Sequence, residues 1–159
     1  MSYGFRAVTE RDLLLLAQWR RLPHVQHWWG PPEVEDAAET LASGLVAMWI
    51  VDHHGRPFAY AQDYSPSNWD EHPFAYLPTG ARGIDQYIGE PDMLDCGHGS
   101  AFVRQHVERL FAEGAPVVGT DPNPENGRAI AAYTKAGFVT ASEPMDTRWG
   151  RALLMECWR

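Results

Sequence analysis

The residue best suited to chemistry is a tyrosine near the end of the chain. Tyr133 follows Asn126 by seven residues, and asparagine is a frequent N-cap of helices. Seven residues make about two helical turns, so the phenol lies on roughly the same face as the cap. A phenol at that place can protonate a leaving thiolate, although a tyrosine taken alone is more often a core aromatic residue.

A glycine-containing segment, Cys96-Gly97-His98-Gly99-Ser100-Ala101, follows one expected strand and opens an expected helix. Glycine lets backbone N–H groups approach a ligand closely, and a helix N-terminus carries partial positive charge. A pyrophosphate therefore fits this segment. The spacing is not that of the dinucleotide fingerprint, and a plain turn between strand and helix is the alternative.

Hydrophobic periodicity and turn residues predict the elements that must position these groups. Strands are expected at residues 3–8, 48–52, 57–64, 82–88, 116–120, 139–141 and 152–158, with a hairpin turn at 53–55. Helices are expected from the Thr9 cap to about residue 23, at 33–46, at 101–113, and from the Asn126 cap to Gly137. This order predicts one mixed α/β domain around a twisted sheet, spanning residues 1–159.

Thr9 is expected to cap the first helix, with Asp12 near its positive end. The segment 65–81 is expected to be a long irregular loop, because it contains four Pro or Gly residues. Its aromatic residues Trp69, Phe74 and Tyr76 indicate a packed flap rather than disordered chain.

Charge and composition limit the partners. The net charge of −8 argues against nucleic acid, whose phosphates need clustered cations. It suits a cationic ligand, although moderate negative charge serves solubility equally well. The N-terminal residues lack the pattern of a secretory signal, and the longest apolar stretch, residues 41–51, is too short to span a bilayer. We therefore expect a cytoplasmic protein that does not bind membranes.

Cysteines and histidines show no metal or disulfide pattern. Cys96 and Cys157 are too few for a disulfide framework. His24 and His27 lie three residues apart, and another histidine pair is adjacent at 53–54, but neither pair has ligands at zinc spacing. No metal site is expected.

Two motifs together resemble a known family. The pattern Asn126…Ala129-Ile130…Tyr133…Lys135-Ala136-Gly137-Phe138 resembles the closing motif of the GNAT acyltransferase superfamily. The turn at residues 97–100 lies where that family binds the pyrophosphate of coenzyme A. Four further stretches are similar to aminoglycoside 6′-N-acetyltransferases: residues 28–30 (WWG), 60–62 (YAQ), 82–86 (RGIDQ) and 120–122 (TDP). The resemblance covers most of residues 9–138, and siderophore-lysine acyltransferases share much of it.

The resemblance implies a GNAT fold: a mostly antiparallel central sheet, splayed between strands 82–88 and 116–120 and flanked by helices. Acetyl-CoA would wedge into the splay. Backbone N–H groups near Gln86 and Tyr87 would polarise the acetyl carbonyl, and Tyr133 would protonate the thiolate. The expected cofactor-binding residues are Gln86, Tyr87, Gly97, His98, Gly99, Ser100, Ala101 and Asn126. Because the amine attacks directly, Cys96 is not expected to carry the acyl group.

One position departs from the family pattern. The family often has Gly, Gln or Arg where this chain has Asp95. A carboxylate near a pyrophosphate is unfavourable, so Asp95 should point away or the affinity for coenzyme A should be modest. A protonated His98 would offset its charge.

The acceptor side of the implied site is acidic and aromatic. Asp85 is the candidate for binding and orienting the attacking amine, and for taking its proton through water. Asp121 lies at the carboxyl end of a strand, where ligands bind in open α/β sheets, and Asp146, expected in a loop, is a third acid. These carboxylates match several ammonium groups on one ligand. The other expected substrate-binding residues are Trp28, Trp29, Tyr60, Gln62 and Trp69, with only one of the adjacent tryptophans touching substrate.

The expected function is acetyl transfer from acetyl-CoA to a primary amine of an aminoglycoside antibiotic, by direct attack in a ternary complex. Three alternatives remain at this point: a siderophore-lysine N-acyltransferase, a protein or peptide N-acetyltransferase, and a non-catalytic binding module of the same fold. Many enzymes of this kind are dimers, so a homodimer is a further expectation.

Overall fold

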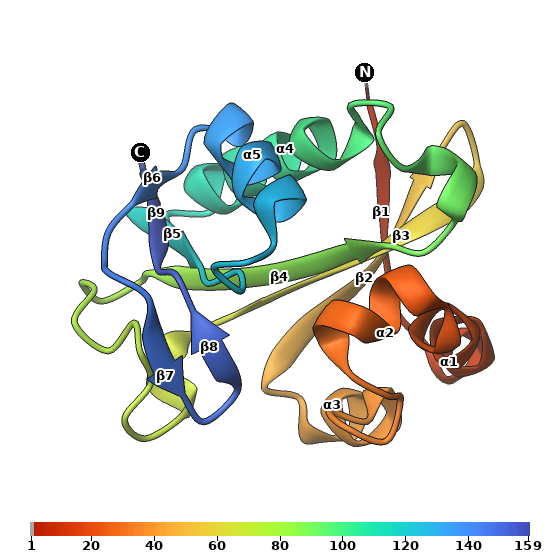
Figure 1. Ribbon diagram of the computed structural model, residues 1–159, viewed down its shortest axis with the longest axis horizontal. Coiled ribbons are helices and arrows are strands. Elements are labelled where there is room, and N and C mark those ends of the chain that lie inside the picture. The colour runs from red at the N-terminus through yellow and green to blue at the C-terminus, as the bar shows by residue number, and fades with distance from the viewer. Residues whose placement is uncertain (1) are drawn as a thin grey trace. The chain divides into compact units, whose positions relative to one another are not determined.

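The computed structural model describes residues 2–159 (Figure 1). Its larger sheet has the strand order β1-β2-β3-β4-β5-β9-β6, and a separate two-stranded sheet pairs β7 with β8. The pairs β1–β2, β5–β9 and β6–β9 are antiparallel, whereas β4 and β5 run parallel. The expected mixed α/β fold with a mostly antiparallel sheet is confirmed.

The chain forms two compact units, and the first comprises residues 2–63 and 86–98. Its elements are β1 (Gly4–Ala7), the short 3₁₀ helix η1 (Glu10–Asp12), α1 (Leu13–Arg21), α2 (Pro23–Trp29), α3 (Ala37–Ser43), β2 (Val46–His53), most of β3 (Arg56–Tyr64) and the 3₁₀ helix η3 (Pro91–Met93). β4 (Arg82–Ile88) supplies residues to both units.

The second unit comprises residues 64–85 and 99–159. Its elements are the 3₁₀ helix η2 (Pro66–Asn68), most of α4 (His98–Ala112), β5 (Val117–Thr120), α5 (Gly127–Ala136), β6 (Val139–Thr140), β7 (Met145–Thr147), β8 (Gly150–Ala152) and β9 (Met155–Trp158).

The predicted cap Thr9 begins the 3₁₀ helix η1, which runs directly into α1 after Asp12. The backbone N–H of Thr9 donates to Asp12 Oδ2 at 2.8 Å, as in a capping box. Arg6 donates to both carboxylate oxygens of Asp12, at 2.8 and 2.9 Å. This guanidinium lowers the pKa of Asp12 to about 2, so the ion pair is intact at neutral pH.

Two helix boundaries differ from the prediction. The helix expected at residues 33–46 is shorter, because Asp36 caps α3 by accepting a hydrogen bond from Ala38 N at 2.7 Å, and Gly44 ends it with a positive φ of 68°. Pro23 does not end the helical region but begins α2, since proline is well suited to the first helical position.

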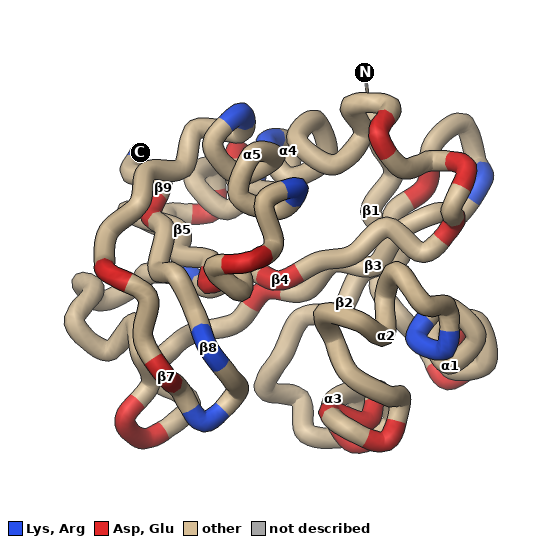
Figure 2. The backbone as a smooth tube through the Cα atoms, in the orientation of Figure 1, with Lys and Arg blue, Asp and Glu red and all other residues tan. Residues whose placement is uncertain are grey.

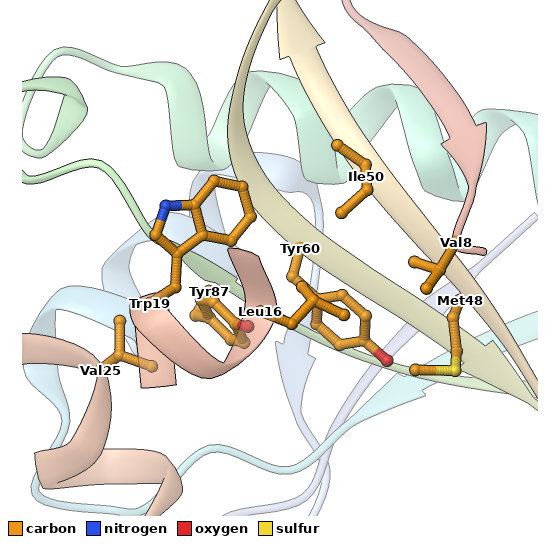
Figure 3. Close-up of a cluster of buried hydrophobic side chains, with 8 residues drawn as sticks. All are labelled: Val8, Leu16, Trp19, Val25, Met48, Ile50, Tyr60 and Tyr87. Atoms are coloured by element: carbon orange, nitrogen blue, oxygen red, sulfur yellow. The ribbon is translucent and has the colours of Figure 1, made fainter. Parts of the chain in front are cut away.

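The first unit has an aromatic-rich core (Figure 3). Its buried members come from α1, α2, β2, β3, β4 and the segment after β1: Val8, Leu16, Trp19, Val25, Met48, Ile50, Tyr60 and Tyr87. Gly89 lies against this core, because a Cβ at that position would overlap the Trp19 ring. The packing requires glycine immediately after β4.

Two glycines have a similar packing role in the second unit. A Cβ on Gly83 of β4 would overlap the ring of Tyr64, and a Cβ on Gly119 of β5 would lie 2.8 Å from the ring of Phe74. Phe74 belongs to the segment 65–81 and is only 1% exposed. The predicted flap is therefore packed, through Phe74, although Tyr76 is exposed.

The C-terminal strands correct the sequence prediction. The strand expected at 152–158 is two strands, β8 and β9, and β8 forms a hairpin with β7 in the register Asp146↔Arg151. The strand breaks because Leu153 N donates to the Pro122 carbonyl at 2.8 Å, and Leu154 N donates to the Ser142 hydroxyl at 3.1 Å. These backbone groups are satisfied by loops and not by a neighbouring strand.

Candidate active site

The strands β4 and β5 separate after a short paired stretch. Their parallel register contains only Arg82↔Val118 and Gly83↔Gly119 within the described residues, whereas β4 continues to Ile88. At the point of separation the Thr120 hydroxyl donates to the Ile84 carbonyl at 3.1 Å. The predicted splay between these two strands is confirmed.

Tyr133 lies on α5, beside this splay. Asn126 caps the helix by accepting a hydrogen bond from Ala129 N at 3.2 Å, and Gly137 ends it with a φ of 108°, as predicted. The phenol is 7% exposed, and its ring packs against Phe138 at 5.5 Å between centroids. Asn126 has a structural role as a cap, and its contact with the cofactor stays a prediction.

The environment of Tyr133 keeps its phenol protonated. Burial raises its pKa most, a hydrogen bond with Thr120 lowers it, and the negative charges of Asp85 and Asp121 raise it further. The net effect is a pKa well above 10. Tyr133 is therefore a hydrogen-bond donor at neutral pH, with the two predicted acids close enough to act on it.

Asp85 and Asp121 lie where β4 and β5 separate. Asp85 lies on β4 one residue after Ile84, and Asp121 follows Thr120 at the end of β5. Both are partly buried. Figure 2 shows acidic residues on β4 and in the segment between β5 and α5. The negative charges of both carboxylates act on the Tyr133 phenol, so the three side chains lie near one another.

Asp146 is not the loop residue that the sequence predicted. It lies in β7, and its carboxylate pairs with Arg151 at 3.0 Å while 86% of its side chain is exposed. The reason is the β7–β8 hairpin, which places residues 146 and 151 opposite each other. Its contact with an acceptor remains a prediction.

The predicted phosphate-binding segment lies at the start of α4. This helix begins at His98, three residues earlier than expected, so Gly99, Ser100 and Ala101 belong to its first turn. The turn itself is made by Asp95 and Gly97, with φ of 58° and 82°. The first N–H groups of a helix have no intrahelical partner, and a Cβ at Gly97 would meet nothing within 4 Å. This open approach to helical N–H groups fits a pyrophosphate.

The surroundings of His98 favour its neutral form. Its Nδ1 lies 2.9 Å from the Tyr3 hydroxyl, in a buried contact. Burial lowers the pKa of His98, and the neighbouring His53 lowers it further. A charged His98 therefore does not offset Asp95 at neutral pH. Asp95 is exposed to solvent.

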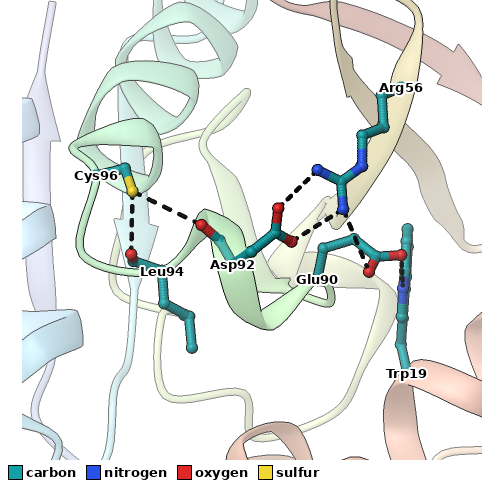
Figure 4. A network of polar contacts seen from close by, with 6 residues as sticks. All are labelled: Trp19, Arg56, Glu90, Asp92, Leu94 and Cys96. Atoms are coloured by element: carbon teal, nitrogen blue, oxygen red, sulfur yellow. Dashed lines mark hydrogen bonds and ion pairs between the residues drawn. The ribbon is translucent and has the colours of Figure 1, made fainter.

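A polar network fixes the segment that leads into α4 (Figure 4). Arg56 of β3 donates to both carboxylate oxygens of Asp92, at 2.8 and 2.9 Å. Trp19 Nε1 donates to Glu90 at 3.1 Å. The Cys96 thiol is directed at backbone carbonyls, with the Leu94 oxygen at 3.2 Å, which gives the thiol a local structural contact.

The expected acceptor residues of the first unit form an aromatic group. The Trp29 ring lies edge-on to Tyr87 at 5.0 Å and to Tyr60 at 6.0 Å. The Tyr60 hydroxyl donates to Gln62 Oε1 at 2.7 Å. Trp28 is 39% exposed, whereas Trp29 packs against the core. One tryptophan of the pair is thus exposed and the other mostly packed, and the expectation that only one of them contacts substrate stays a prediction.

Tyr87 and Gln86 follow Asp85 on β4. The Tyr87 side chain is buried in the core of the first unit, and burial raises its pKa while Arg20 acts in the opposite direction. The side chain is therefore occupied by packing. Any contact with an acetyl group at these positions would come from the backbone, which stays a prediction.

Trp69 belongs to an aromatic cluster in the second unit that the sequence did not reveal. Its ring is 5.2 Å from Tyr64 and 6.5 Å from Trp149. His72 lies between them, buried, 5.0 Å from Trp149, and its Nδ1 accepts a hydrogen bond from Phe74 N at 3.0 Å. Burial lowers the pKa of His72 to about 4. The flap and the β7–β8 hairpin therefore share one set of aromatic contacts.

Three residues of this region were missed: Thr120, His72 and Trp149. A threonine after the apolar residues of a strand gives a weak signal, because hydroxyls at strand ends are common. His72 and Trp149 are brought together by a hairpin that the periodicity did not predict. No local pattern could have paired them.

The His, Cys, Asp and Glu side chains of residues 2–159 do not gather into a metal-ligand cluster. No group of three or more His, Cys, Asp or Glu residues in this range could hold a metal ion. No helix of the described chain is both long and apolar enough to cross a bilayer.

Comparison with known proteins agrees with this geometry. Residues 8–145 match the acetyltransferase (GNAT) domain family. The aminoglycoside N(6′)-acetyltransferase type 1 of Klebsiella pneumoniae is 37% identical over 151 residues, which cover 86% of this chain and 74% of the relative. The chain therefore belongs to the GNAT acetyltransferase family.

Solved structures give the same result. A structure of AAC(6′)-Ib with paromomycin and acetyl-CoA has a TM-score of 0.89 and 33% identity, covering 100% of this chain and 94% of that one. Another, with coenzyme A and kanamycin, has a TM-score of 0.89 and 34% identity, covering 99% and 95%. The resemblance to aminoglycoside 6′-N-acetyltransferases thus holds in both sequence and structure.

Proposed function

We propose that this protein transfers the acetyl group of acetyl-CoA to a primary amine of an aminoglycoside. The observation that carries the proposal is the grouping of the protonated Tyr133 phenol with Asp85 and Asp121 where β4 and β5 separate. The Tyr133 phenol can donate a proton to a leaving sulfur, and the carboxylates of Asp85 and Asp121 can attract an ammonium group. The relatives named above, which are aminoglycoside acetyltransferases, support the same substrate class.

Acetyl-CoA supplies the activated acetyl thioester. The first turn of α4, from His98 to Ala101, donates backbone N–H groups to its pyrophosphate. After Gly83, β4 is no longer paired with β5, and its free backbone groups would hold the pantetheine arm of acetyl-CoA. Backbone N–H groups near Gln86 and Tyr87 would polarise the acetyl carbonyl. Tyr133 donates its proton toward the departing sulfur.

The carboxylates serve the acceptor. Asp85 binds and orients the attacking amine and takes its proton through water, and Asp121 binds a second ammonium group. The other proposed acceptor contacts are Trp28, Tyr60, Gln62, Trp69 and the more exposed Asp146.

We also propose that both compact units belong to one catalytic domain, which is supported by their shared strand β4. The homodimer stays a prediction, to be tested by sedimentation.

The deciding experiment is thiol release from acetyl-CoA with a panel of acceptors. Kanamycin-type aminoglycosides, lysine hydroxamates and peptide amines are compared at low and high salt. We expect aminoglycosides to have the highest kcat/KM, with affinity falling as salt rises, because screening weakens attraction to an acidic site. Equal kcat/KM for mono-amines and aminoglycosides, without salt dependence, would contradict the substrate class and leave the acetyltransferase family assignment.

A further inference from the structure

Arg20 is a buried cation on α1. Arg20 is only 5% exposed, although arginine is rarely buried without a carboxylate partner. No ion pair joins it to Asp or Glu anywhere in residues 2–159, and its Nε has no hydrogen-bond partner there. The charge is instead stabilised by backbone dipoles.

These dipoles all belong to residues 29–35, the last residue of α2 and most of the connection to α3. The guanidinium lies within hydrogen-bonding distance of five carbonyl oxygens: Trp29 at 3.2 Å, Gly30 at 3.4 Å, Pro31 at 2.9 Å, Val34 at 2.6 Å and Glu35 at 3.3 Å. Helix C-terminal carbonyls such as that of Trp29 lack intrahelical partners and favour a nearby cation. Arg20 reaches these carbonyls from a neighbouring helix: Nη1 donates to Glu35, and the two N–H groups of Nη2 are shared among the other four.

The connection needs this support. Gly30 and Glu35 both have positive φ, 73° and 55°, and a left-handed conformation is unfavourable for a residue such as glutamate. Apart from the bond from Val34 N to the Pro31 oxygen, the connection has little regular structure. The planar guanidinium, with several N–H donors, is suited to hold several carbonyls at once.

Arg20 also contacts the aromatic group of the proposed acceptor side. Its guanidinium carbon lies 5.5 Å from the centroid of the Trp29 ring, a distance typical of a cation–π contact. Trp29 in turn packs edge-on against Tyr60 and Tyr87. The exposed Trp28 immediately precedes this held segment, so its position depends on how the chain leaves α2.

We propose that Arg20 is a positioning residue for the acceptor: by holding the carbonyls of residues 29–35 it fixes the end of α2, and thereby the orientation of Trp28. This inference rests on the proposed function, in which Trp28 contacts the aminoglycoside. Arg20 acts through the chain and does not itself touch substrate. The first turn of α4 is outside the held segment, so acetyl-CoA binding should not depend on Arg20.

The test compares Arg20→Met with Arg21→Met, which removes the same charge from the adjacent, exposed position. We expect Arg20→Met to raise KM for kanamycin at least about tenfold while KM for acetyl-CoA changes less than about twofold. Arg21→Met should change neither. Arg20→Lys should recover part of the loss, because an ammonium group can donate to some of the carbonyls but cannot reproduce the planar fork. If Arg20→Met does not fold, the Arg20→Lys variant replaces it in this comparison.

A double variant tests the route through Trp28. Combined with Trp28→Ala, the Arg20→Met change should raise the kanamycin KM by less than about threefold, because Trp28→Ala already removes the side chain through which Arg20 acts, and coupled effects are not additive. Full multiplication of the two effects, or an equal rise in both KM values, would overturn the proposal.

Amide hydrogen exchange separates this inference from the proposed function, since it needs no turnover. In Arg20→Met or Arg20→Lys, exchange should accelerate in residues 29–35 and stay unchanged in α4. Unchanged exchange in residues 29–35 would overturn the holding role even if the wild type acetylates aminoglycosides. A wild type inactive on every aminoglycoside would overturn both the proposed function and the acceptor role.

Discussion

The Thr120 hydroxyl and the Ile84 carbonyl are joined across the point where β4 and β5 stop pairing. Thr120 is 1% exposed, so this hydrogen bond is buried. It satisfies a carbonyl of β4 at the point where β4 and β5 no longer pair through their backbones. It holds the last residues of β5 near β4. The residues that follow, Asp85 and Asp121, are thereby kept near Tyr133.

Replacing Tyr133 by phenylalanine should lower kcat about 10²-fold with little change in KM for acetyl-CoA, because a proton donor to the departing sulfur is lost. Steady-state kinetics measures this. The matched control is Tyr76→Phe, which removes a phenol that is exposed and bonded to Glu156, and it should be close to wild type. An effect under about threefold in Tyr133→Phe would remove the phenol from the mechanism.

Removing the carboxylate charges should weaken acceptor binding. We expect Asp85→Asn to reduce kcat/KM for kanamycin at least about tenfold and to lower kcat, because charge-assisted hydrogen bonds are worth roughly 1.5–3 kcal/mol. Asp121→Asn should act mainly on KM. Glu108→Gln, which removes an exposed acid from α4, is the control for net charge. If all three variants behave alike, the carboxylates have no specific role.

The turn before α4 should tolerate asparagine better than valine. Gly97 has a φ of 82° and open space around it, so a substitution is limited by backbone conformation and by the approach of phosphate. Gly97→Val should weaken coenzyme A binding at least about tenfold, whereas Gly97→Asn should stay within a few fold, because asparagine adopts this conformation more readily. Calorimetry measures both. Equal, undiminished affinity in Gly97→Val and in Gly99→Val would contradict the pyrophosphate assignment.

His72 should make the fold sensitive to acid. Burial and the charge of Arg148 lower its pKa from 6.5 to about 4, so the unfolded chain takes up this proton at a higher pH than the folded chain. The stabilisation from neutral His72 is therefore complete above about pH 6.5 and is lost as the pH falls toward 4. We expect a loss on the order of 1–3 kcal/mol across that range.

The measurement is Tm between pH 7 and pH 4.5 for the wild type and His72→Gln, which keeps an acceptor for Phe74 N but does not titrate. The Tm of His72→Gln should fall less. His27→Gln, at an exposed histidine, should follow the wild type. The ion pair of Asp12 interferes little, because its stabilisation is lost mainly as the pH falls from the ordinary carboxyl pKa of 3.8 toward 2, below the range measured. Parallel curves for all three proteins would show that His72 does not contribute.

Local patterns predicted the parts of the fold that local chemistry determines. The Asn126 cap, the Gly137 stop and the 82–88 strand follow from capping residues and apolar periodicity, and all three are confirmed. Tyr133 and Asp121 could be placed because each lies a fixed number of residues from such a signal. Asp146 could not, since its position depends on a hairpin of three-residue strands.

Arg20 shows a signal that was present but unused. Leu16 and Arg20 are four residues apart on α1, and both are buried, so the helical period places the arginine in the apolar stripe. A charged residue in that stripe predicts a polar partner. Which carbonyls it reaches depends on the left-handed turns at Gly30 and Glu35, and the conformation of a glutamate there cannot be read from its neighbours.

The glycines at positions 83 and 119 limit how this protein can change. Each lies under an aromatic ring, Tyr64 or Phe74, so that even a methyl group is too large. If the gene were randomised and selected for acetylation of new amines, these two codons should stay invariant. Variation would concentrate where side chains are exposed, as at Trp149 on the hairpin tip. β4 and β5 would then keep glycine at these two positions, while substitutions that change acceptor preference accumulate at exposed side chains.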